Sequence, residues 1–165
     1  MRTFRNLIVV PVFAVMAASA APALAAQAKA PADGSVARGK YLVTIGGCND
    51  CHTPGYPEKG GNVPEEQWLI GDQLGWRGPW GTTYAANLRL RVQEMSEDQW
   101  VTLARTAELR PPMPWFNLRR MTEPDLRAVY RYIRHMGPAG QRAPAYVPPD
   151  QQPKGPYVQF PAPPK

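Results

Sequence analysis

The stretch Cys48-Asn49-Asp50-Cys51-His52 decides how this chain is interpreted, because it has the spacing Cys-x-x-Cys-His. Two residues between the cysteines place both thiols on one helical turn, at the separation of the two vinyl groups of a haem. The histidine that follows is then placed under the iron as its proximal ligand. The motif therefore predicts one covalently attached haem c, with its iron, held by Cys48, Cys51 and His52.

Three other uses of a Cys-x-x-Cys pair are weaker interpretations of the same residues. A structural zinc site needs four ligands, usually from two such pairs, and this chain has only two cysteines. A thioredoxin-like redox pair belongs at the end of a strand that opens a helix, and nothing upstream of Cys48 has the pattern of a strand. A disulfide that closes a short loop is the third alternative.

Residues 1–25 have the three parts of a secretory signal peptide. Arg2 and Arg5 precede an apolar run that begins at Leu7, and alanines surround a cleavage point after Ala25. Retention of this segment as a membrane anchor is the alternative, although its prolines and many alanines make a poor span. We therefore expect a periplasmic protein with no stable membrane span after cleavage, in a compartment where haem c is attached to reduced thiols.

Length and charge limit the classes of protein and partner. About 140 residues remain after cleavage, which fits one domain. Loss of Arg2 and Arg5 leaves 17 basic against 13 acidic side chains, a formal charge of +4. This mild positive balance is compatible with docking onto an acidic protein, or with a simple basic surface. The chain has no nucleic-acid-binding motif, so nucleic acid is not expected as a partner.

The rest of the chain divides into a linker over 26–34, a haem domain over 35–137 and a tail over 138–165. Nine of the 28 tail residues are prolines, which predicts an extended segment. The tail is expected to be a strap on the domain surface, a disordered end, or a partner-docking segment that uses its aromatic side chains.

Apolar periodicity and capping residues predict three helices, over 35–45, 96–104 and 122–137. The stretch from Thr53 to Glu94 is rich in Gly, Pro and Trp and has no sustained period, so it predicts loops that wrap a ligand. A buried haem would give such a long irregular stretch something to pack on. The predicted fold class is therefore all-α, with about three main helices and long loops around one covalent haem.

Met113 is the expected sixth ligand of the iron. Pro111, Pro112 and Pro114 stiffen the segment around it, so its thioether can be presented with little loop entropy left to lose. Its position between two predicted helices lets the chain return to the opposite face of the haem. The competing ligand candidates are Met121, Met95, Met136 and His135. In the loop region, Arg77 and Trp80 are further candidates for binding the haem propionates.

Several stretches resemble the class I cytochromes c: Gly39-Lys40-Tyr41-Leu42, the motif from Gly47 to Gly55, Tyr84-Ala85-Ala86-Asn87-Leu88, Met113-Pro114-Trp115 and Met121-Thr122-Glu123-Pro124-Asp125-Leu126. More narrowly, they look like the haem domains of cytochrome subunits that serve periplasmic alcohol and sugar-acid dehydrogenases. The resemblance covers about residues 35–137. It implies a cytochrome c-like fold, with His52 and Met113 as the axial iron ligands.

A haem ligated on both faces has no vacant position for oxygen or peroxide, which predicts transfer of single electrons. We expect no enzyme activity, whether the protein is a free shuttle or a subunit of a dehydrogenase complex. The expected partners are redox proteins: a dehydrogenase, an oxidase or another cytochrome. The alternative function is a haem enzyme or gas sensor with a labile sixth ligand, similar to a peroxidase.

Overall fold

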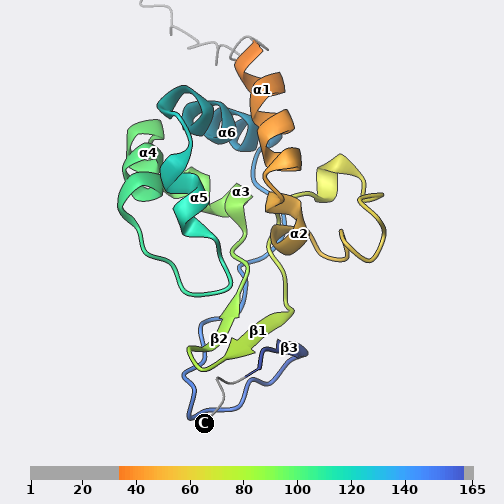
Figure 1. Cartoon of the computed structure of the whole chain (residues 1–165). Helices are drawn as coiled ribbons and strands as arrows, with labels where there is room; N and C mark the ends of the chain where they lie inside the picture. The colour runs from red at the N-terminus through yellow and green to blue at the C-terminus, as the bar shows by residue number, and fades with distance from the viewer. Residues whose placement is uncertain (1–33, 162–165) are drawn as a thin grey trace, which may run out of the picture. The chain divides into compact units, whose positions relative to one another are not determined.

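Six helices and a three-stranded sheet form residues 34–161, the part of the chain that the computed structural model describes (Figure 1). The helices are α1 (Gly34–Ile45), α2 (Cys48–His52), α3 (Leu88–Arg91), α4 (Glu97–Thr106), α5 (Trp115–Arg120) and α6 (Glu123–Met136), with single 3₁₀ turns at η1 (Glu65–Gln67) and η2 (Val92–Glu94). The strands are β1 (Gly75–Gly78), β2 (Gly81–Tyr84) and β3 (Tyr157–Gln159). The predicted signal peptide over 1–25 and nearly all of the linker over 26–34 lie outside the described residues.

The sheet shows that the all-α prediction was wrong. Its strand order is β2-β1-β3, with β1 antiparallel to β2 and parallel to β3. The first two strands form a hairpin that turns at Gly81, whose φ of 97° is unfavourable for any residue with a side chain. Strands of three or four residues are too short to show an alternating apolar pattern, so this stretch had the appearance of loops. Figure 1 shows the sheet extending away from the helices.

The three predicted helices are confirmed as α1, α4 and α6, and their caps explain where two of them begin. Ser96 and Gln99 form a reciprocal capping box at the start of α4. The Thr122 hydroxyl accepts a hydrogen bond from the Asp125 N–H at the start of α6, and Gly137 ends that helix with a φ of 71°. The number of helices was underestimated, because α2, α3 and α5 have only four to six residues each.

The core is built around the crossing of α1 and α6. Leu42 and Val43 of α1 are buried with the apolar face of α6, which includes Leu126, Val129 and Ile133. The two backbones approach most closely at Gly39, where an added Cβ would lie 2.0 Å from the Ala128 carbonyl oxygen. Only glycine allows this approach, so residue 39 sets the distance between the two helices.

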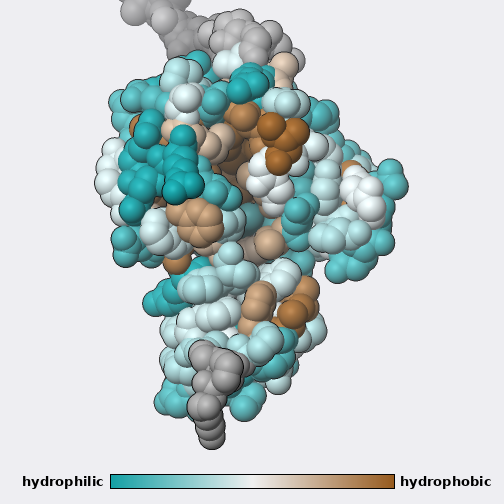
Figure 2. All heavy atoms as spheres, in the orientation of Figure 1, coloured by the Kyte–Doolittle hydropathy of each residue, from teal (hydrophilic) through white to brown (hydrophobic). Residues whose placement is uncertain are grey.

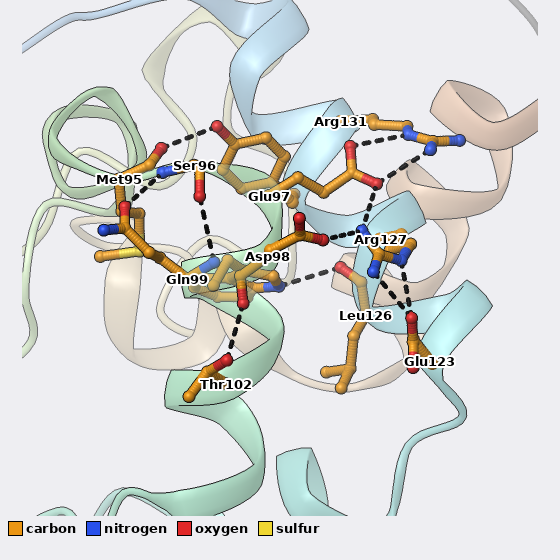
Figure 3. Close-up of polar contacts among 12 residues, drawn as sticks. Met95, Ser96, Glu97, Asp98, Gln99, Thr102, Glu123, Leu126, Arg127 and Arg131 are labelled. Atoms are coloured by element: carbon orange, nitrogen blue, oxygen red, sulfur yellow. Dashed lines mark hydrogen bonds and ion pairs between the residues drawn. The ribbon is translucent and has the colours of Figure 1, made fainter.

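An ionic cluster and one buried hydrogen bond attach α4 to α6 (Figure 3). The Glu97 carboxylate accepts hydrogen bonds from Arg127 at 3.2 Å and from Arg131 at 2.8 and 3.0 Å. Partial burial raises the pKa of Glu97, but the hydrogen bonds from these arginines outweigh it, so that the pKa lies below its usual value. The Trp100 indole N–H donates to the Leu126 carbonyl at 2.9 Å. Together these contacts fix α4 beside the central crossing.

Within residues 34–161, no helix is both long and apolar enough to cross a membrane.

The crossing gives a prediction for Gly39→Ala. In an open helix this substitution stabilises by up to about 1 kcal/mol, but here the new methyl group meets the α6 backbone. We expect the free energy of unfolding to fall by about 2 to 3 kcal/mol, measured by urea denaturation. As a control, Ala37→Gly at an exposed position of α1 should cost about 1 kcal/mol through helix propensity alone. A Gly39→Ala protein as stable as the wild type would contradict the close approach.

Candidate functional site

The Cys-x-x-Cys-His motif forms helix α2, directly after α1. Gly46 and Gly47 make the connection: a Cβ on Gly46 would lie 2.7 Å from the Leu42 carbonyl oxygen, and Gly47 has a left-handed φ of 67°. Cys48 and Cys51 are one helical turn apart, half-buried and present as free thiols. The local geometry therefore gives the two thiols the placement on one turn that the sequence predicted.

His52 is buried, and its ring is oriented by one hydrogen bond from Nδ1 to the Ala86 carbonyl oxygen, at 2.7 Å. A carbonyl oxygen only accepts, so Nδ1 carries the hydrogen and Nε2 carries the lone pair. Burial lowers the pKa of His52, more strongly than the bond to Ala86 raises it, which keeps the ring neutral. A neutral imidazole with a free Nε2 lone pair is the form that binds a metal.

The cysteines are in an environment that keeps them protonated. Burial and the nearby Asp50 carboxylate raise the pKa of Cys48 to about 11. Burial also raises the pKa of Cys51, with Asp50 again contributing. Redox-active Cys-x-x-Cys pairs have a lowered thiol pKa, because the thiolate is the reactive form. This environment therefore disfavours a thioredoxin-like function.

A buried polar chain holds the back of α2 and was not found by sequence analysis. The Thr53 hydroxyl donates to Asn49 Oδ1 and accepts from the Leu69 N–H, each at 2.8 Å. Leu69 is fully buried with a φ of 61°, a rare conformation for a residue with a side chain. The Gly71 N–H also donates to the His52 carbonyl at 2.8 Å. The loop 69–71 therefore fixes the backbone of the motif from behind.

Met113 lies half-buried between α4 and α5. Its segment is tied to β2, because the Thr83 hydroxyl donates to the Pro111 carbonyl oxygen at 2.6 Å. Thr83 is three residues before Ala86, the partner of His52, so these two attachment points lie at most about 11 Å apart along the backbone. The predicted iron ligands His52 and Met113 are therefore connected through one short segment, although they come from distant parts of the sequence.

The other sulfur ligand candidates have packing roles. Met95, Met121 and Met136 all pack against the buried core. Met113 is not among the side chains that pack there in the described part of the chain. His135 is exposed near the end of α6. Among the ligand candidates of residues 34–161, Met113 is thus partly buried but does not pack against the core cluster.

A hollow with apolar side chains on its walls lies between α1 and α5 (Figure 2). These helices also carry large apolar residues with high exposure: Tyr41 at 52% and Ile45 at 61% on α1, and Phe116 at 50% on α5. Isolated exposed apolar residues are ordinary, whereas a hollow with apolar walls is typical of a binding surface. The two thiols and the available imidazole nitrogen on one short helix fit a covalently attached haem.

Two surface cavities lie elsewhere. One, of about 490 Å³, is lined mainly by residues 144–156 of the tail together with Gln73 and Tyr84. The other, of about 220 Å³, is lined by Glu65, Glu66, Arg89, His135 and Met136. Neither contains Cys48, Cys51, His52 or Met113. In the described residues, no group of three or more His, Cys, Asp or Glu side chains could hold a metal ion. A haem iron does not require such a cluster, because the porphyrin supplies four of its ligands.

Arg77 on β1, Trp80 in the hairpin turn and Arg89 on α3 have structural partners. The Arg77 guanidinium, considered above for haem propionates, donates to the carbonyl oxygens of Pro149 and Gln151. Trp80 donates its indole N–H to the Trp76 carbonyl, although at 3.3 Å. Arg89 is buried and donates to the carbonyls of Glu66, Met136 and Gly137, which places a cation at the C-terminus of α6. This role of Arg89 has no local signal in the sequence.

Comparison of the chain with models of protein families, with characterised proteins and with solved structures gave no match. The resemblance to class I cytochromes c therefore stays a prediction from the motifs.

The thiol environment predicts slow alkylation of the reduced, haem-free protein. Because the pKa of Cys48 is about 11, its thiolate fraction at pH 8 should be about a hundredfold below that of the unfolded chain. Reaction with iodoacetamide, followed by mass spectrometry, should accelerate as the pH rises toward 11 for Cys48. The same chain in urea, as the control, should titrate near the ordinary cysteine pKa. A folded Cys48 that titrates below pH 8 would contradict this description.

Proposed function

We propose that this protein is an exported electron carrier with one covalently bound haem c. Cys48 and Cys51 would hold the haem through thioether bonds, and His52 and Met113 would be the two axial ligands of its iron. The periplasm is the proposed compartment, because it combines the N-terminal export signal with the conditions for haem c attachment. The chemistry of the site supports this proposal. The fold class does not, because the fold includes a three-stranded sheet that the sequence did not predict.

The observation that carries this proposal is the hydrogen bond from His52 Nδ1 to the Ala86 carbonyl. It fixes the tautomer and the orientation of the ring, as second-shell partners of metal-bound histidines do. The ring belongs to the same short helix as two free thiols. A histidine that is buried for packing alone does not need to follow a Cys-x-x-Cys pair, whereas the proximal ligand of a haem c does.

The roles of the residues follow from their chemistry. When bound, the haem would supply an iron that gains and loses one electron. His52 would donate its Nε2 lone pair, and the bond to Ala86 would increase the basicity of the ring. Met113, on a segment held by Thr83, would occupy the second axial position and exclude other ligands. The apolar side chains around the hollow would limit access of water, which favours electron transfer over ligand chemistry.

The proposed partners are redox proteins. The motifs resemble haem domains that serve periplasmic dehydrogenases, so a dehydrogenase, an oxidase or another cytochrome is the expected donor or acceptor. The formal charge of +4 after removal of residues 1–25 is compatible with an acidic partner surface. Under this proposal the protein itself catalyses no reaction on a substrate.

The ligand assignment can be tested by comparing Met113→Ala with Met121→Ala in protein expressed with the haem-attachment machinery. Wild type and Met121→Ala should both be low-spin, and their ferrous forms should bind carbon monoxide weakly. Met113→Ala should lose the absorption of methionine-ligated ferric haem and bind carbon monoxide readily, because one axial position becomes open. Absorption spectra of the oxidised and reduced proteins provide the measurement.

An unchanged low-spin spectrum in Met113→Ala would refute Met113 as the ligand. High-spin iron in the native wild type would refute the electron-carrier function and would favour the alternative of a labile sixth ligand.

A further inference from the structure

The proline-rich segment 138–161 is attached to the rest of the molecule along its whole length. At its start, Asn87 Nδ2 donates to the carbonyls of Ala139 and Gln141, at 2.7 and 3.1 Å. In its middle, Val147 and Thr82 exchange two backbone hydrogen bonds, at 2.7 and 3.0 Å. At its end, β3 pairs with β1 (Figure 1). An exposed segment with so many prolines would not order itself without these bonds.

Arg77 is the centre of this attachment. Its guanidinium donates to the Gln151 carbonyl at 2.9 Å, to the Pro149 carbonyl at 3.2 Å and to the Thr82 hydroxyl at 3.0 Å. Its own carbonyl accepts from the Phe160 N–H at 2.7 Å. One side chain on β1 therefore joins β2 to two points of the tail, where prolines at 148, 149 and 153 offer no N–H donors. These charged hydrogen bonds are the strong type.

Along the sequence, two contacts with the tail flank the two hydrogen bonds that reach the segments of the predicted iron ligands. The strand segment 82–87 bonds to the tail at its two ends, through Thr82 and Asn87. Between them, Thr83 holds the Pro111 carbonyl on the Met113 side, and Ala86 holds His52. Displacement of the tail would therefore remove one contact at each end of the segment that positions both ligands, leaving it held by the pairing of β2 with β1.

A second link joins the tail directly to the segment that carries Met113. The Arg110 guanidinium lies over the Tyr146 ring, 4.0 Å from its centroid. The Tyr146 hydroxyl donates to the Trp80 carbonyl at 2.7 Å, which fixes the ring on the hairpin. Because three of the residues around Met113 are prolines without an N–H donor, this segment has few other groups with which to attach itself.

We propose that segment 138–161 is a clamp that keeps Met113 and His52 in position to bind the iron, with Arg77 and Tyr146 as positioning residues. This inference rests on the proposed function and extends it. Loosening the clamp increases the fraction of molecules in which Met113 has left the iron, while the covalent haem stays attached through Cys48 and Cys51. With the tail attached, both axial positions of the iron would be occupied. With the tail displaced, one axial position would be open.

The test uses the full-length, haem-loaded protein and the variants Arg77→Met and Tyr146→Leu. Arg77→Met keeps the apolar stem and removes the donors, and Tyr146→Leu removes the ring over which Arg110 lies. Arg142→Ala is the matched control, because the side chain of this tail arginine forms an exposed ion pair with Glu94, away from the hairpin. Three quantities are measured: the rate of limited proteolysis in the tail, the absorption of methionine-ligated ferric haem, and the affinity of the ferrous protein for carbon monoxide.

In both clamp variants we expect faster proteolysis of the tail, a weaker methionine absorption and about a tenfold rise in carbon monoxide affinity, with covalent haem retained. Arg142→Ala should behave as the wild type. Unchanged carbon monoxide affinity in both variants overturns the clamp, whether or not proteolysis becomes faster. The proposed function fails separately, in the wild type, if no covalent haem is present or if its iron is high-spin, and the clamp then fails with it.

Discussion

The hydrogen bond from His52 to the Ala86 carbonyl is the contact on which the functional part of this structure depends. It makes a backbone group of the segment after β2 the partner of a side chain in α2, 34 residues earlier. For this bond to form, the whole stretch between α2 and β2 must fold back on α2. The buried chain through Asn49, Thr53 and Leu69 performs this task, because it ties that stretch to the motif from inside.

The helical part provides the rigid support for this contact. The crossing at Gly39 fixes the position of α1 against α6. Only two residues, Gly46 and Gly47, separate α1 from α2. The polar cluster around Glu97 then places α4, and α4 and α5 frame the Met113 segment. A close backbone approach in the core therefore helps to determine where the thiols lie, while Thr83 and Ala86 contact the segments that carry the predicted iron ligands. The two parts of the fold have different roles at one site.

Local signals in the sequence predicted part of this arrangement. The Cys-x-x-Cys-His spacing, the Ser96 capping box and the Thr122 cap each act within a few residues, so they can be recognised without a structure. The hairpin could not be recognised, because four-residue strands that begin or end in glycine show no period. Pairing of β3 with β1 joins residues about eighty positions apart, and nothing local in the tail indicates a strand. The partner of His52, the Ala86 carbonyl, could not be recognised from the sequence, since every residue has a carbonyl and none has a sequence signature for this role.

The intact mass of the exported protein, measured under denaturing conditions, tests the central claim most directly. Thioether bonds survive denaturation, so the account predicts the mass of the polypeptide plus one haem. Substitution of both Cys48 and Cys51 by alanine should reduce this to the polypeptide mass alone. A wild-type mass equal to that of the bare polypeptide, or lower by two hydrogens because Cys48 and Cys51 form a disulfide, would contradict the account.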